Sequence, residues 1–179
     1  MKYLKYTLLV LLIAFVAYFS YAILFPSSPL DKVVYSSENS TFTYEVEYSR
    51  PYKKGRLIFG DSDKALVPYG EYWRTGANAA TTFSTSEDII FGQDSLKAGK
   101  YSLYTIPGEN TWTVVFNSDS ERWLAAGEAD TIKDVLRVSI SSSKTTETVE
   151  QFTIDFSPDS LNTYMNLKWD KTLISIPLK

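Results

Sequence analysis

The chain has 179 residues, a net charge of −3 from 18 Lys and Arg against 21 Asp and Glu, and neither Cys nor His. That length suits a single domain. The mild acidity without a basic cluster argues against nucleic-acid binding, because phosphate neutralisation needs concentrated Lys and Arg. The missing Cys and His exclude disulfides, thiolate chemistry, zinc or haem ligation by these residues and every triad with a His base. The sequence therefore predicts no cofactor, no metal site and no nucleic-acid partner.

An apolar segment lies near the start of the chain. Residues 7–25 contain no charged side chain, and as a helix they would span roughly 28 Å, close to the thickness of a bilayer core. Lys2 and Lys5 precede this segment, and the next basic residue is Lys32. Because basic residues stay on the cytoplasmic side, the pattern predicts a cytoplasmic amino terminus at residues 1–6 and a transmembrane helix at 7–25.

A short linker and one exported domain are expected after this helix. Pro26 and Pro29 flank two serines, which would end the helix and stiffen residues 26–32 as a linker. Residues 33–179 then form the domain, on the outer, periplasmic side of the cell membrane.

A cleaved signal peptide is the alternative to a permanent anchor. Ser20, Tyr21 and Ala22 form a small-x-small cleavage pattern after an apolar stretch. The apolar residues Ile23–Phe25 continue past that point, which favours an uncleaved anchor. Both alternatives place the domain outside the cytoplasm.

The exported part shows the period-two alternation of β-strands that are buried on one face. Residues 41–48 place Phe42, Tyr44, Val46 and Tyr48 on one side. Further strands are expected at residues 56–59, 81–85, 88–91, 101–106, 110–117, 135–140, 149–156, 161–169 and 172–178. About ten short strands without long amphipathic helices predict an all-β fold, an antiparallel β-sandwich or a jelly-roll-like domain. Only residues 120–129 could form a short helix.

Three stretches carry a resemblance to a known family. They are residues 48–60 (Tyr-Ser-Arg-Pro, Lys-Gly-Arg, Ile-Phe-Gly), 66–78 (Leu-Val-Pro-Tyr-Gly, Trp-Arg-Thr-Gly-Ala-Asn) and 96–117 (Tyr-Ser-Leu-Tyr-Thr-Ile-Pro-Gly, Trp-Thr-Val-Val-Phe-Asn). With residues 134–138, they resemble a bacterial family called domain of unknown function 2911. The resemblance implies an exported domain and supplies no catalytic residue. Residues 61–65 interrupt the family pattern, so the sequence does not support a metal site at Asp61 and Asp63.

A candidate ligand-binding set lies within these stretches. Arg74 offers a planar fork of donors for carboxylate, phosphate or sugar oxygens, Trp73 could stack on a flat group, and Asn78 adds a donor and an acceptor. Arg50 and Arg56 could join them as an anion-binding patch if the strands adjoin. The structural alternative is that Trp73 belongs to the core, that Arg74 bonds turn carbonyls, and that the basic residues near 50–56 protect an edge strand.

These patterns predict a membrane-anchored extracytoplasmic β-domain that binds a ligand or partner of the cell envelope: a glycan, a small anion or a protein. One alternative is a carbohydrate-active hydrolase using two carboxylates. Its candidate acids are Glu71, Glu87, Asp88, Glu109 and Asp134, and no spacing selects a catalytic pair. The other alternative is a purely structural module. We expect a binding role rather than an enzyme.

Overall fold

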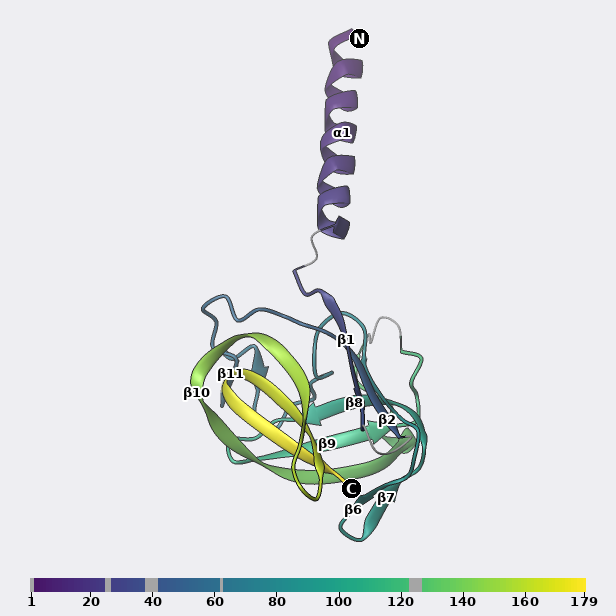
Figure 1. The fold of residues 1–179 in the computed structure, drawn as a ribbon. Helices are drawn as coiled ribbons and strands as arrows, with labels where there is room; N and C mark the ends of the chain where they lie inside the picture. Colours follow the sequence, from purple (N-terminus) through teal and green to yellow (C-terminus); the bar gives the residue numbers. More distant parts are fainter. Residues whose placement is uncertain (1, 25–26, 38–41, 62, 123–126) are drawn as a thin grey trace.

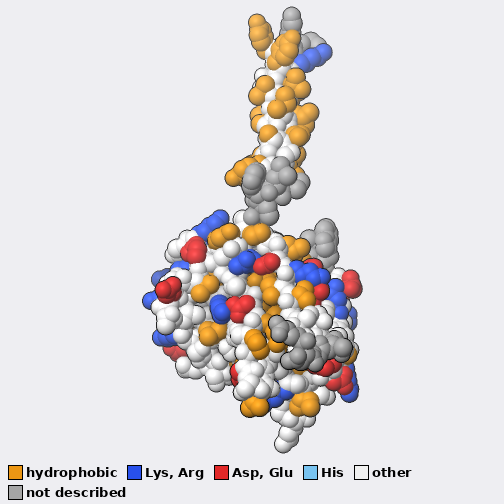
Figure 2. All heavy atoms as spheres, in the orientation of Figure 1, with side chains coloured by type: hydrophobic (Ala, Val, Ile, Leu, Met, Phe, Trp, Pro, Cys, Tyr) orange, Lys and Arg blue, Asp and Glu red, His pale blue; other side chains and the backbone are white. Residues whose placement is uncertain are grey.

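The computed structural model describes the whole chain except residues 1, 25–26, 38–41, 62 and 123–126. Helix α1 (Lys2–Leu24) stands apart from a β-rich domain (Figure 1). The large apolar side chains described along it are all exposed, and they cover its surface in Figure 2. Within the described residues, no helix reaches the length and mean hydropathy of a membrane span. The transmembrane helix therefore stays a prediction.

One curled antiparallel sheet of seven strands forms a half-barrel. The all-β expectation is confirmed, and a single curled sheet takes the place of the two face-to-face sheets that we expected. Its order is β1 (Leu30–Ser36), β2 (Thr43–Ser49), β5 (Thr81–Thr85), β8 (Gly99–Ile106), β9 (Thr111–Asn117), β10 (Asp134–Pro158) and β11 (Thr163–Leu178). Strand β1 starts inside the predicted linker.

Two small strand pairs and one helical turn complete the described elements. Strands β3 (Phe59–Gly60) and β4 (Val67–Pro68) pair in parallel, and β6 (Ile89–Phe91) forms a hairpin with β7 (Asp94–Leu96). A 3-10 turn, η1 (Thr131–Lys133), precedes β10. Of residues 120–129, where a short helix was expected, 123–126 lie outside the described residues and the rest contain no helix.

Buried and exposed side chains alternate along β2 as the sequence predicted. Tyr44, Val46 and Tyr48 of β2 are at most 2% exposed, whereas Glu47 between them faces solvent. Strand β9 buries Trp112, Val114 and Phe116 on the corresponding face, and its Val115 and Asn117 are buried as well, on the opposite face. The main core lies on the first of these faces, and the curl of the sheet wraps around it.

Strands β10 and β11 are longer than the sequence suggested. The pattern predicted two strands in each region, but β10 has 25 residues and β11 has 16. A straight 25-residue strand would reach about 80 Å, so β10 has to bend. Its register with β11 shifts between Lys144 and Val149 and again before Thr153, which is where bulges allow the bend. The first part of β10 pairs with β9 and the later part curls over the core.

Aromatic rings fill the centre of the half-barrel. Trp73 stacks on Trp169, with ring centroids 5.8 Å apart, and meets Phe152 edge-on at 5.0 Å. Phe59 meets Trp112 edge-on at 4.9 Å. Such offset and edge-to-face pairs add to the stabilisation from burying the rings.

The curl closes where the chain after β2 meets the middle of β10. The Lys53 N–H donates to the Glu150 carbonyl at 2.7 Å, and the Phe152 N–H donates to the Pro51 carbonyl at 2.9 Å. The buried Tyr48 hydroxyl accepts from the Ile154 N–H at 2.8 Å and donates to the Ile154 carbonyl at 3.3 Å. These bonds join residues about a hundred positions apart in sequence.

Replacing Tyr48 by Phe tests this closure. The ring stays, but the Ile154 N–H is left buried without an acceptor, so we expect the free energy of unfolding to fall by about 1–3 kcal/mol. Chemical denaturation of the full chain measures it. Tyr52→Phe is the control, because Tyr52 is exposed and its change should stay within ~0.5 kcal/mol. Equal effects of both substitutions would contradict the role given to the Tyr48 hydroxyl.

Candidate functional site

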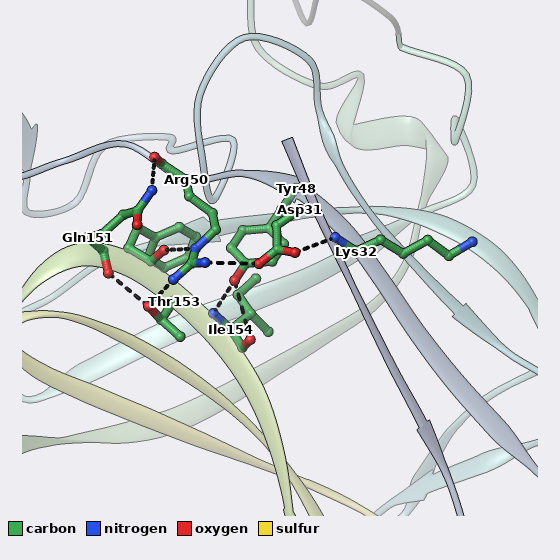
Figure 3. Close-up of polar contacts among 8 residues, drawn as sticks. Asp31, Lys32, Tyr48, Arg50, Gln151, Thr153 and Ile154 are labelled. Atoms are coloured by element: carbon green, nitrogen blue, oxygen red, sulfur yellow. Dashed lines mark hydrogen bonds and ion pairs between the residues drawn. The ribbon is translucent and has the colours of Figure 1, made fainter. Parts of the chain in front are cut away.

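Arg50 is held inside the closure of the half-barrel (Figure 3). Its Nη1 forms an ion pair with Asp31 at 3.1 Å, its Nε donates to the Phe152 carbonyl at 3.2 Å and its Nη2 donates to the Thr153 hydroxyl at 2.9 Å. Gln151 donates to the Arg50 carbonyl at 3.2 Å. The guanidinium is therefore engaged along three sides, and it ties β1 and β2 to β10.

Trp73 lies in the core, in agreement with the structural alternative for this residue. It is 7% exposed, and its indole N–H donates to the Gly76 carbonyl at 3.2 Å. Arg74 donates to the Asn78 carbonyl at 2.9 Å, and the Asn78 amide donates to the Ser28 carbonyl at 3.3 Å. These three residues thus shape one turn, and that turn contacts the linker.

The turn at residues 73–78 has an unusual backbone. Thr75 has φ 54°, in the left-handed region that a β-branched residue rarely adopts, and Asn78 has φ 60°, in the same region, which asparagine tolerates. Gly76 has φ 156°, and an added Cβ would lie 3.0 Å from the Ser49 carbonyl oxygen and 3.1 Å from the Thr81 hydroxyl. A buried hydrogen bond stabilises this strained backbone, because the Thr81 hydroxyl donates to the Thr75 carbonyl at 2.7 Å.

The loop that carries Arg56 is fixed by its own backbone. Arg56 donates through Nε to the Lys53 carbonyl at 3.0 Å and through Nη2 to the Tyr52 carbonyl. The Lys54 N–H donates to the Glu150 carboxylate at 2.8 Å. Lys53 is neutralised by an ion pair with Asp170 at 3.0 Å. Neither Lys54 nor Arg56 forms an ion pair among the residues described, although the Glu150 carboxylate lies beside the Lys54 backbone.

The two regions that contain the predicted ligand-binding residues, near residues 50–56 and 73–78, line one cavity of about 410 Å³. We call it the linker-side cavity. It lies at the end of the domain where the chain arrives from α1. Its lining residues are Ser27, Ser28, Pro51, Tyr52, Lys54, Arg56, Leu66, Gly76, Ala77 and Trp169. Of the five residues predicted to bind a ligand, only Arg56 lines it. Trp73, Arg74 and Asn78 belong to the turn that carries the lining residues Gly76 and Ala77. Arg50 bonds to β10 next to the cavity.

Trp169 lines this cavity and carries a buried hydrogen-bond donor. The residue is 2% exposed, and its Nε1–H has no partner among the described residues. Buried donors are almost always paired, and because this nitrogen is itself buried, an acceptor in the cavity reaches it only if the neighbouring side chains move. The alternation in β11 predicted that Trp169 faces inward, but no sequence signal shows that its N–H is left without an acceptor.

The opposite face of the sheet carries a polar network that is closed on itself. The Asp134 carboxylate, 8% exposed, accepts from Tyr104 at 2.9 Å, from Asn117 at 2.8 Å and from the Arg137 Nε at 3.0 Å. Burial and the adjoining Asp134 carboxylate raise the pKa of Tyr104 to about 12. Asp134, Tyr104, Asn117 and Arg137 satisfy one another, which favours a structural role, although the buried Ser102 hydroxyl opposite Asn117 has no partner among the described residues.

The carboxylates offered for hydrolysis do not converge. Glu87, Glu109 and Asp134 line three different cavities. A hydrogen bond from Lys97 lowers the pKa of Asp88, which is opposite to what a general acid needs. The described residues also contain no group of three or more acids that could hold a metal ion. The geometry gives the hydrolase alternative no support.

Comparison with known families gives one match over most of the domain. The family described as "Protein of unknown function (DUF2911)" matches residues 28–178. Searches of the curated proteins and of the solved structures found no match.

Substituting Gly76 by Ala tests the strained turn beside the cavity. We expect a larger loss of stability than for Gly92→Ala, because Gly92 has φ 65° but nothing within 4 Å of an added Cβ. Gly92→Ala should cost about 1–2 kcal/mol from backbone strain alone, and Gly76→Ala should exceed it through the clash with Ser49. Denaturant unfolding of both variants decides this. A smaller effect at Gly76 would show that the turn relaxes without consequence.

Proposed function

The chain belongs to the DUF2911 family, whose function is unknown, and we propose that it is a membrane-anchored extracytoplasmic binding module. Its ligand would be a small anion with an apolar part, held in the linker-side cavity. The observation that carries this proposal is a cavity lined by two cations, Lys54 and Arg56, that form no ion pair among the described residues, and by Trp169, whose buried Nε1–H has no partner among them.

The lining of the cavity matches such a ligand. Lys54 and Arg56 supply positive charge, and an Arg has further N–H groups beyond the two that Arg56 spends on its own loop. The indole N–H of Trp169 adds a neutral donor. Tyr52 and Leu66 supply apolar surface. A carboxylate or phosphate attached to an apolar group would use all three features, since charge-assisted hydrogen bonds fix its orientation.

The anchor is supported by the apolar segment at residues 7–25 and by the exposure of α1. Thirteen large apolar side chains between Tyr3 and Tyr21 are more than half exposed, a surface that favours transfer out of water by roughly 25 cal/mol per Å². None of these side chains contributes to the core of the domain. The charge pattern around the segment favours an outward-facing domain.

Two other roles remain as alternatives. The structural module would explain Arg50 and Trp73, which hold the barrel together, but not the unpaired donor of Trp169. The hydrolase would require a pair of converging carboxylates. The binding module is therefore the role that the geometry favours.

Binding of phenyl phosphate and benzoate tests the anion site. We expect the full chain, in an uncharged oligo-oxyethylene detergent at low salt, to bind at least one of them by titration calorimetry. Arg56→Gln should weaken binding about 10-fold or more, since hydrogen bonds to charged groups contribute ~1.5–3 kcal/mol. Trp169→Phe should also weaken it, because the ring is largely kept while the donor is lost.

Lys100→Gln is the matched control for charge. Lys100 is exposed on β8 and lies outside the cavity lining, so its loss should leave affinity within about twofold, as expected for a screened charge. The proposal is contradicted if neither anion binds, or if Lys100→Gln weakens binding as much as Arg56→Gln.

Cell fractionation tests the anchor separately. We expect the full chain to stay in the membrane pellet after alkaline carbonate washing, because helical residues 7–25 would be held by lipid. Protease added to spheroplasts should degrade the domain. A domain that survives this digestion, or a mature mass that lacks the first 22 residues, would overturn the anchor without touching the anion site.

A further inference from the structure

A second cavity, of about 270 Å³, lies at the end of the half-barrel away from the linker. Strand β1 leads from the linker at Leu30 to this end at Ser36, and the carboxyl terminus lies here in Figure 1. We call it the distal cavity. Three parts of the chain meet around it: the adjoining ends of β1 and β2, the turn after β5, and the turn between β10 and β11.

Aromatic rings form one wall of the distal cavity. Tyr35 and Phe42 are half-buried, and Tyr44 is 2% exposed behind them. Tyr35 lies parallel to Tyr44 with centroids 6.2 Å apart, and Phe42 lies 5.0 Å from Tyr44. Phe156 packs against Tyr35 at 5.9 Å. The rings contact one another, so they form a continuous apolar surface, and its partly exposed members Tyr35 and Phe42 line the cavity.

Polar groups on two fixed turns also line the distal cavity. Thr85 accepts from the Glu87 N–H at 3.3 Å and donates to the Glu87 carbonyl at 2.6 Å, which sets the position of the Glu87 residue. The Asp159 carboxylate accepts from the N–H groups of Leu161 and Asn162, both at 2.7 Å. The Glu87 carboxylate and the Asn162 amide therefore border the cavity on preorganised backbone.

The buried tyrosine adds a donor. Burial and the nearby Glu87 carboxylate raise the pKa of Tyr44 to about 12. Its hydroxyl hydrogen-bonds to the Glu87 side chain and so helps to orient that carboxylate at the cavity. The distal cavity thus combines acceptors, donors and an apolar wall, and Lys179 offsets part of the negative charge.

We propose that the distal cavity binds a saccharide, with one pyranose ring lying against Tyr35 and Phe42 and its hydroxyl groups bonded to Glu87 and Asn162. A pyranose has an apolar C–H face, which suits the electron-rich faces of aromatic rings, and hydroxyl edges, which suit mixed donors and acceptors. The volume lies just below the roughly 300–1,000 Å³ of sites for drug-sized ligands, which fits a single sugar ring.

The ring geometry distinguishes a sugar from a quaternary ammonium ion. An aromatic cage surrounds a cation with rings that face a common centre. Here Tyr35, Phe42 and Tyr44 pack on one another at 5.0 to 6.2 Å, so they leave no such centre between them. A flat ligand face is what this surface accommodates. The linker-side cavity, with its two cations, suits a different class of ligand, and the two sites are independent.

Saturation-transfer NMR with methyl β-D-glucoside and N-acetylglucosamine tests this site on the full chain in oligo-oxyethylene detergent, which carries no sugar. We expect saturation to reach the ring C–H protons of at least one sugar. Phe42→Ala should weaken binding about 10-fold or more through lost stacking, whereas Tyr35→Phe should leave it within about twofold. Glu87→Gln should weaken it several-fold, and Asp88→Asn is the matched control outside the cavity lining.

Glu87→Gln changes an exposed side chain and should leave folding intact, so weaker sugar binding by this variant reports on the distal cavity itself. The proposal fails if neither sugar binds at tens of millimolar, if tetramethylammonium competes with the sugars at these residues, or if Asp88→Asn weakens binding equally. Arg56→Gln should leave sugar binding unchanged, so failure of the anion site and failure of the sugar site give different results.

Discussion

The return of β10 onto the segment after β2 is the constraint on which the rest of the structure depends. The pairing of β2 with β5 ends at Glu47, so residues 48–53 extend beyond β5. Backbone groups of Pro51 and Lys53 and the Arg50 guanidinium therefore hydrogen-bond to β10. A buried cation or amide left without a partner is costly, and the closure satisfies both at once. The linker-side cavity follows from this closure, because the loop that bears Lys54 and Arg56 continues directly from residues 51–53, which hydrogen-bond to β10.

The same interaction explains why the sequence indicated a ligand site where the structure has a framework. Arg50 lies among basic residues on the chain, and an inward and an outward arginine look identical in sequence. Its partners, Phe152 and Thr153, are more than a hundred residues away, beyond the reach of any local pattern. Trp73 is similar: its stacking on Trp169 depends on a loop and a strand, β11, that only the fold brings together. The loops were located correctly, but the roles of most side chains in them were not determined by local sequence.

Strand periodicity was the part of the fold that the sequence could predict. The alternation of Tyr44, Val46 and Tyr48 follows from two-residue geometry and needs no knowledge of the partner strand. The continuity of β10 was not predictable in this way, because the polar residues 142–144 interrupt the apolar pattern while still pairing with β11, and residues 145–148 continue the strand across a register shift. Strand β1 was missed at the linker for a related reason: its edge position buries little on either face.

The two ends of the half-barrel differ in whether they contain features that reduce the free energy of unfolding, and this difference bears on function. At the linker end, Thr75 and Asn78 hold left-handed backbone, and the buried Trp169 donor has no partner among the described residues. Such features cost on the order of 1–3 kcal/mol each and persist where the surrounding structure enforces them. The distal end shows no comparable strain among its described residues; its tyrosines and fixed turns are satisfied internally and leave ring faces partly open. An anion would thus complete the linker end, whereas a sugar at the distal end would bind to a surface that is already complete.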